Sequence, residues 1–204
     1  MKLNKMLALA LSGVMAVSML AGCSGAPSNG EEGQEQPPVA ATGAAAVLND
    51  EQDIIEFTNG STTQLELATS MLNANEMYAN GLVVLSNTNK VYNNLEDMGV
   101  ENLTNSWASK FNTNQDPDKA ETTVVVFAVK GTDKSMNNAL KAVANDQIKE
   151  GLKKEEVVGG KLYTYSYTGS VSAVTATSID GTTSTNYVML TITRNLAKRD
   201  IDVK

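Results

Sequence analysis

Residues 122–129 constrain the fold more than any other segment of the sequence. They are Thr-Thr-Val-Val-Val-Phe-Ala-Val. Apolar and β-branched side chains at successive positions predict a strand that is covered on both faces or deeply buried. Gly131 then predicts a turn, and Asp133 predicts a helix cap. A helix over about 134–153 follows from an apolar stripe at helical spacing, made of Met136, Ala139, Leu140, Val143, Ala144, Ile148 and Leu152.

Weaker patterns predict three further elements on the N-terminal side of this strand. Ser61–Gln64 fits a capping box and precedes apolar residues at helical spacing, which predicts a helix over about 62–79. A shorter helix is expected at about 90–98, ending at Gly99. Leu103, Trp107 and Phe111 lie four residues apart and fit one helical face, with Trp107 expected in the core.

The sequence predicts strands throughout the C-terminal third of the chain. Lys161–Thr168 follows the Gly159-Gly160 break, and two runs, Ser170–Ser178 and Thr185–Thr193, flank Asp180-Gly181 as a hairpin would. The predicted order of elements is two or three helices, then a strand, a helix and further strands. This order predicts an α+β fold. We expect an antiparallel or mixed sheet of three to four strands with helices packed on it, after a disordered tether.

The first residues have the pattern of an export signal. Lys2 and Lys5 precede an uncharged, largely apolar run to Gly22, which is too short for a typical membrane span. The run ends in Leu-Ala-Gly-Cys, which resembles the lipobox of bacterial lipoproteins. That resemblance implies cleavage between Gly22 and Cys23 and a diacylglyceryl group on the Cys23 thiol. The alternatives are an uncleaved membrane helix, or an ordinary secretory signal that leaves an odd free thiol.

Three parts are therefore expected: a signal peptide at 1–22, a lipidated cysteine with its tether at 23–46, and one globular domain at 47–204. Residues 24–42 are rich in Gly, Ser, Pro and Gln and contain little that could build a core. Loss of Lys2 and Lys5 leaves 14 cations against 23 acids, so the net charge is 14 − 23 = −9. This balance argues against nucleic-acid binding and against electrostatic docking on anionic lipid head groups.

Catalytic side-chain sets are missing from the sequence. The chain has no histidine and one cysteine, and it lacks a phosphate-binding Gly-rich loop. We therefore lean toward a non-enzyme and expect no cofactor. Asn112, Asn114, Asp116 and Asp118 alternate as calcium ligands do. Pro117 stands where that loop needs glycine and Thr123 replaces the closing Glu, so we expect a solvated loop and no metal.

Two segments allow a binding role beside a structural one. Tyr163, Tyr165 and Tyr167 share one face of the expected strand, so they are either core under a helix or an exposed binding face for a sugar or a partner. The Ser/Thr-rich hairpin 171–193 has the pattern of a half-exposed sheet. Its edge could pair with another chain by strand addition, or its face could be simply solvated.

The chain resembles a family of small lipoproteins of unknown function from clostridia and related Firmicutes. The matching segments are Leu67–Leu72, Val91–Leu95, Thr123–Val129, the helix from Ser135, and Asn186–Leu190. The resemblance implies a lipobox, a tether and a compact domain. The tyrosine strand and the long hairpin depart from it.

These observations predict a domain held by lipid on the outer face of a cytoplasmic membrane, where it binds another envelope protein or a wall component without catalysis. One alternative is a carboxylate-based hydrolase that acts on the cell wall. The other is a small-ligand receptor for a transporter, although two-lobed receptors of that kind are usually larger than this domain.

Overall fold

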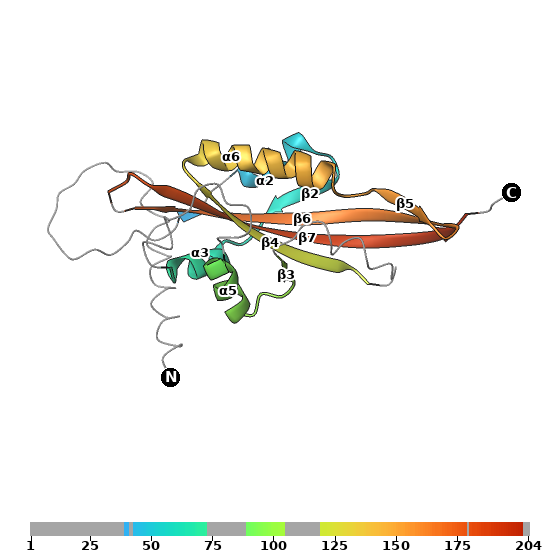
Figure 1. Cartoon of the computed structure of the whole chain (residues 1–204), viewed down its shortest axis with the longest axis horizontal. Helices are drawn as coiled ribbons and strands as arrows, with labels where there is room; N and C mark the ends of the chain where they lie inside the picture. Colours follow the sequence, from blue (N-terminus) through green and yellow to red (C-terminus); the bar gives the residue numbers. More distant parts are fainter. Residues whose placement is uncertain (1–38, 41–42, 73–88, 105–118, 179, 202–204) are drawn as a thin grey trace. The chain divides into compact units, whose positions relative to one another are not determined.

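The computed structural model describes residues 39–40, 43–72, 89–104, 119–178 and 180–201 (Figure 1). Every described residue belongs to one compact unit, Glu35–Lys204. The signal, Cys23, Trp107 and the 112–118 loop lie outside the described residues. Within the described ranges, no helix has the length and apolar character that crossing a membrane requires.

The described residues form a single seven-stranded mixed sheet. Its centre is β4, β7 and β6, which are antiparallel, while β2 runs parallel to β6 and β3 runs parallel to β4. The α+β class and the mixed sheet are confirmed. The sheet is larger than the three to four strands expected, because four short edge strands carry too few residues to show a pattern. The strands are β1 (Val39–Ala40), β2 (Ile55–Asn59), β3 (Leu103–Thr104), β4 (Glu121–Lys130), β5 (Glu155–Val158), β6 (Lys161–Thr177) and β7 (Ser184–Asp200).

Helices cover both faces of the sheet (Figure 1). On one face, here called the α6 face, lie α2 and a continuous helix formed by α6 and η1; on the other, the α3 face, lie α3 and α5. Each face buries its own apolar cluster, so the molecule has two cores separated by the sheet. The helices are α2 (Ala44–Glu51), α3 (Thr63–Ser70), α5 (Asn89–Asp97), α6 (Asp133–Ala142) and the π-helix η1 (Val143–Lys149).

Strand β4 has the two-sided burial that its sequence predicts. Val125, Phe127 and Val129 face the α6 side, and the alternate residues Val124 and Val126 face the α3 side. Successive side chains of a strand point to opposite faces, so an uninterrupted apolar run requires a cover on each side. This strand therefore forces the layered arrangement of helix, sheet and helix.

The helix expected at 134–153 is present as α6 and η1 and ends four residues earlier, at Lys149. Met136, Leu140 and Ile148 from the apolar stripe are buried, as is Ala144. Gly151 follows the helix end, and a Cβ there would lie 2.3 Å from the Gln147 carbonyl oxygen. A side chain at residue 151 would clash with the last turn of the helix, so only glycine fits at this position.

The N-terminal helices follow their predictions in part. Helix α5 agrees with the expected 90–98 segment, whereas α3 begins at Thr63 and the described helix ends at Ser70. The predicted capping box is wrong: Thr62 is the N-cap, and its hydroxyl donates to the Glu66 carboxylate at 2.6 Å. Leu103 lies in β3 and not on a helix.

The folded domain begins before the expected boundary at residue 47. Strand β1 pairs with Val174 and Thr175 of β6, and α2 starts at Ala44 with Ala44 and Ala45 buried. Three small alanines in a row carry no amphipathic pattern, so composition alone assigned them to the tether. Their burial depends on contact with the sheet.

The predicted hairpin is present and longer than expected. Lys161–Thr168 and Ser170–Ser178 belong to one strand, because β6 and β7 pair continuously from Lys161↔Asp200 to Thr177↔Ser184. Gly169 stands in the middle of β6, where a Cβ would lie 2.6 Å from the Phe57 ring. Glycine therefore does not break the strand; it leaves room for an aromatic side chain from β2.

The turn of this hairpin holds a carboxylate whose titration is a test of its geometry. Asp180 accepts hydrogen bonds from the Ser178 hydroxyl and from both the amide and the hydroxyl of Thr182. These hydrogen bonds lower the pKa of Asp180 from 3.8 to about 2, and the bond from Ser178 makes the largest contribution. A lowered folded pKa means that the carboxylate stabilises the fold above pH 3.8 and loses this effect as the pH falls through about 2.

We expect carboxyl-carbon NMR titration of the folded protein to give Asp180 a pKa of about 2. In Ser178→Ala the same pKa should rise toward 3.8, because the largest contribution is removed. An exposed serine outside the turn, Ser70, supplies the control Ser70→Ala, which should leave the titration unchanged. An unshifted Asp180 in the parent protein would contradict the turn geometry.

Candidate functional site

Strand β6 alternates tyrosine with hydroxyl residues, and the alternation separates them onto two faces. Tyr163, Tyr165 and Tyr167 point to the α6 face and are 6%, 8% and 8% exposed. They belong to the same apolar cluster as Ile148 and Leu152. The core interpretation therefore agrees with the structure, and the tyrosines do not form an exposed binding face.

The tyrosine hydroxyls reach the rim of this core. The Tyr167 hydroxyl donates to the Lys153 carbonyl oxygen at 2.9 Å, and the Tyr165 hydroxyl donates to the Glu156 carboxylate at 3.2 Å. Burial raises the pKa of Tyr167 to about 12 and also raises the pKa of Tyr165. Both phenols are thus protonated donors at neutral pH and tie the chain after η1 to the sheet.

A buried arginine lies beside these tyrosines. Arg194 of β7 stands opposite both Tyr167 of β6 and Glu121 of β4, so the three residues form one row across the sheet. Its guanidinium donates to the Glu121 carboxylate at 2.8 Å and lies 5.0 Å from the centroid of the Tyr165 ring. The arginine side chain is 4% exposed and that of Glu121 is 23% exposed. Because Glu121 already neutralises the charge of Arg194, we interpret this row as a structural link that joins β4, β7 and β6. We call the Glu121–Arg194 pair the clamp.

Sequence reasoning overlooked Arg194, although a signal was present. Leu190, Ile192 and Arg194 alternate along β7, so the arginine occupies an inward position. A charged residue at an inward position needs a partner. The partner is 73 residues away in sequence and could not be identified without the register.

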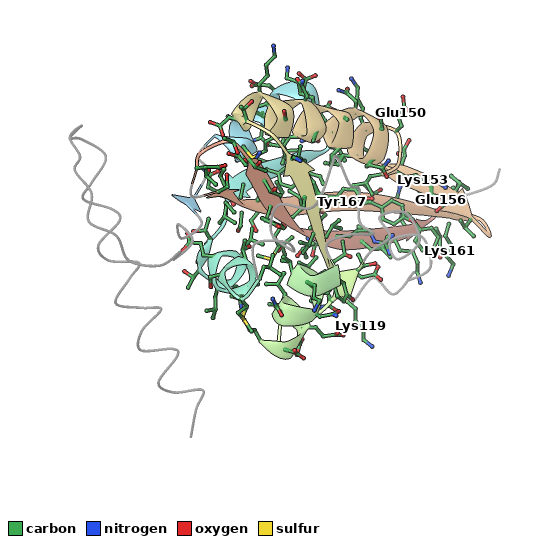
Figure 2. All side chains as sticks on the ribbon, turned by 60° about the vertical axis from the view of Figure 1, so that its left-hand side comes forward. Lys119, Glu150, Lys153, Glu156, Lys161 and Tyr167 are labelled. Carbon is green, nitrogen blue, oxygen red and sulfur yellow. The ribbon has the colours of Figure 1, made fainter. Side chains whose placement is uncertain are left out.

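Glu156, beside these tyrosines, is held in its ionised form. Lys153 donates to Glu156 at 2.8 Å, and this bond is the main reason that the pKa of Glu156 is lowered (Figure 2). The described carboxylates with shifted pKa values all move downward, namely Glu51, Asp53, Glu156 and Asp180. A glycosidase-type acid needs a raised pKa. Within the described ranges, there is also no cluster of three or more metal-ligating acids.

The exposed hydroxyl side chains of the long hairpin lie earlier in β6 than the predicted segment 171–193. Most of the 171–193 hairpin is buried, because α3 and α5 cover the α3 face there. The exposed hydroxyls are instead Thr164, Ser166 and Thr168, on the same face beyond the helices. The edges of the predicted segment are also occupied, by β1 and β2 on β6 and by β4 on β7. These strands therefore occupy most of the edge that strand addition at 171–193 would use.

Strands β5, β6 and β7 extend past the helices as a three-stranded ribbon (Figure 1). We define the ribbon tip as residues 157–162 and 196–201. Val158 and Lys161 pair across the turn made by Gly159 and Gly160, whose φ angles of 59° and 77° suit a type I′ turn. The Ile201 amide donates to the Gly160 carbonyl oxygen at 3.0 Å, which holds the end of β7 against the turn.

The ribbon tip carries most of the exposed apolar side chains among the described residues. Four large hydrophobic residues are exposed, and three belong to the tip: Val157 at 61%, Val158 at 37% and Ile201 at 37%. The fourth, Met71, follows α3. Isolated exposed apolar residues are ordinary, whereas a cluster at one end of a molecule suggests an interaction site.

No protein-family model, curated protein or solved structure matches this chain.

Proposed function

We propose that this chain is a lipid-anchored bacterial lipoprotein on the outer face of the cytoplasmic membrane, and that its domain is a non-catalytic binding module of the cell envelope. The carrying observation is Cys23, the single cysteine, placed directly after Leu20-Ala21-Gly22 and an uncharged apolar run. The resemblance to small lipoproteins of clostridia and related Firmicutes supports the same location.

The attachment follows from the energetics of acyl chains. Burial of each CH₂ contributes about 0.8 kcal/mol, and a single chain gives only reversible membrane binding. A diacylglyceryl group inserts two chains at once, so the anchored protein would not leave the bilayer on its own.

The side-chain chemistry supports a binding module over the hydrolase alternative. The chain has no histidine, and the carboxylates with shifted pKa values among the described residues are held ionised by lysines, hydroxyls and amides. An ionised carboxylate cannot donate the proton that a leaving group requires at neutral pH. The exposed ribbon tip supplies a surface for contact with a partner.

The test is replacement of the anchor residue. We expect the parent chain, produced in a lipoprotein-processing bacterium, to sediment with membranes and to carry a diacylglyceryl group on an N-terminal Cys23 by mass spectrometry. The Cys23→Ala variant should lose nearly all membrane attachment by the two-chain argument. Ser24→Ala, one residue later, should fractionate as the parent does. An unacylated N-terminus in the parent would refute the anchor.

The enzymatic alternative has its own test. We expect the purified protein to release no soluble fragments from cell-wall material. Turnover that disappears on replacing one carboxylate, for example by Glu156→Gln, would overturn the non-catalytic part of the proposal while leaving the anchor intact.

A further inference from the structure

We propose that the ribbon tip docks on an anionic lipid bilayer, with Val157, Val158 and Ile201 entering the head-group region and Lys161, Lys198 and Arg199 contacting lipid phosphates. This inference deepens the proposed function, since it rests on a location beside a membrane and names the bilayer itself as a partner. It concerns a different part of the molecule from the lipid on Cys23.

The placement of the apolar side chains favours a fluid environment over a flat protein surface. Val157 and Val158 are successive residues of β5, so they point to opposite faces of the ribbon. A flat partner surface could bury one of them and would leave the other in water. The interfacial region of a bilayer surrounds whatever enters it, so it can cover both faces of a narrow tip together.

The cations flank the apolar end of the ribbon. Lys161 pairs with Val158, Arg199 lies in the same row as Val157, and Lys198 lies one residue further back. Lys198 and Arg199 are successive residues of β7, opposite Tyr163 and Leu162, so one cation lies on each face of the ribbon. Lysine and arginine bury their aliphatic stems while their charged ends stay at the level of the head groups. Apolar side chains with cations beside them and one residue behind them, whose charged ends can extend to the phosphates, suit a membrane interface.

Local charge at the ribbon tip differs from the charge of the whole chain. The tip has three cations, Lys161, Lys198 and Arg199, and one acid, Asp200, which gives 3 − 1 = +2. Asp200 lies 3.9 Å from Lys161, whereas no ion pair involves Lys198 or Arg199 among the described residues. Charges are screened over about 8 Å at physiological ionic strength. Glu155 and Glu156 directly precede Val157 in β5 and lie within this distance, although Glu156 is paired with Lys153. More distant acidic residues oppose the contact weakly.

The chain between the proposed anchor and the domain is long enough for both attachments. Cys23 and Val39 are separated by 39 − 23 = 16 residues, which span at most about 55 Å when extended. Strand β1 pairs with Val174, and 174 − 161 = 13 residues of β6 from there to Lys161 span about 43 Å. The ribbon tip is thus within reach of the bilayer that holds Cys23.

Vesicle flotation tests the proposal without any contribution from the anchor. The mature chain, residues 23–204 with Cys23→Ala, is mixed with vesicles of phosphatidylglycerol and phosphatidylcholine or of phosphatidylcholine alone. We expect binding to the anionic vesicles that weakens with salt. Lys198→Gln with Arg199→Gln should reduce it roughly 25-fold, because each cation near such a surface contributes about fivefold. The matched pair Lys130→Gln with Lys134→Gln, on exposed residues at the other end of β4 and at the start of α6, should leave binding unchanged.

The apolar contribution is tested on the same vesicles. Val157→Ser, Val158→Ser and Ile201→Ser together should weaken binding by tenfold or more, as expected for removing buried apolar surface. Met71→Ser, which is also exposed but lies outside the tip, should have no effect. All these side chains are solvent-exposed, so circular dichroism should show the same fold in each variant.

A single-label measurement shows where the contact is. Because the chain has one cysteine, Cys23→Ala with Val157→Cys places a polarity-sensitive dye at one position only. Its emission should shift to the blue on adding anionic vesicles, and a dye at Met71→Cys should not shift. Absent vesicle binding, or tip variants that bind as well as the parent, would overturn the proposal. Membrane fractionation that depends on Cys23 would still support the lipid anchor in that case.

Discussion

Replacing Leu140 with alanine is expected to lower the free energy of unfolding by about 3–5 kcal/mol. Leu140 lies in α6, is 0% exposed, and belongs to the cluster that fills the α6 face of the sheet. The cost combines the lost burial of its side chain with the cavity that a close-packed core cannot fully close. A domain of this size is stable by about 5–15 kcal/mol, so the variant would lose a large share of its stability.

Urea denaturation followed by circular dichroism measures this effect. The matched control is Asn138→Ala, two residues earlier on the same helix and exposed to solvent. It should change stability by no more than about 0.5 kcal/mol. If Leu140→Ala had an effect as small as the control, α6 could not be packed on the sheet as described.

The second large effect is expected at the clamp between Glu121 and Arg194. Replacing Glu121 with alanine should destabilise the domain by about 2–4 kcal/mol, somewhat less than the roughly 3–5 kcal/mol for breaking a fully buried ion pair. The reason is that Arg194, at 4% exposure, remains buried after losing its carboxylate. The reduced magnitude reflects the Tyr165 ring, which still contacts the guanidinium, and the partial exposure of Glu121.

The reverse replacement should cost less. In Arg194→Met the apolar volume is largely kept, and the remaining carboxylate of Glu121 is 23% exposed and can bind water. We expect a loss of about 1–2 kcal/mol, and a coupling energy of about 1–3 kcal/mol in the double-mutant cycle. Equal losses for the two single variants and no coupling would show that the pair does not act as a clamp.

Local patterns predicted the long elements of this fold well. The apolar run in β4, the stripe in α6 and the Asp180-Gly181 turn each express a period or a turn signal within a few residues, and all three agree with the structure. The tyrosine alternation in β6 also predicted one shared face. Its two interpretations differed only in whether a helix covers that face, which no local pattern encodes.

The candidate surface could be predicted much less well. Val157 and Val158 form a short apolar pair before two glycines, and Ile201 is more than forty residues away. They lie at one end only because β5 and β7 flank the same part of β6. The same long register placed Thr164, Ser166 and Thr168 in solvent and buried most of the Ser/Thr-rich segment that composition had marked as half-exposed.

The amino-acid order alone was sufficient for the α+β class, the central strand and the amphipathic helix, because each depends on side chains close together along the chain. It is also the whole basis for the proposed anchor at Cys23. The position of the buried arginine's partner, the start of the domain at β1 and the apolar ribbon tip depended on pairing between distant segments. Register along seventeen-residue strands selects those neighbours, and a shift of one residue would exchange the two faces of every strand.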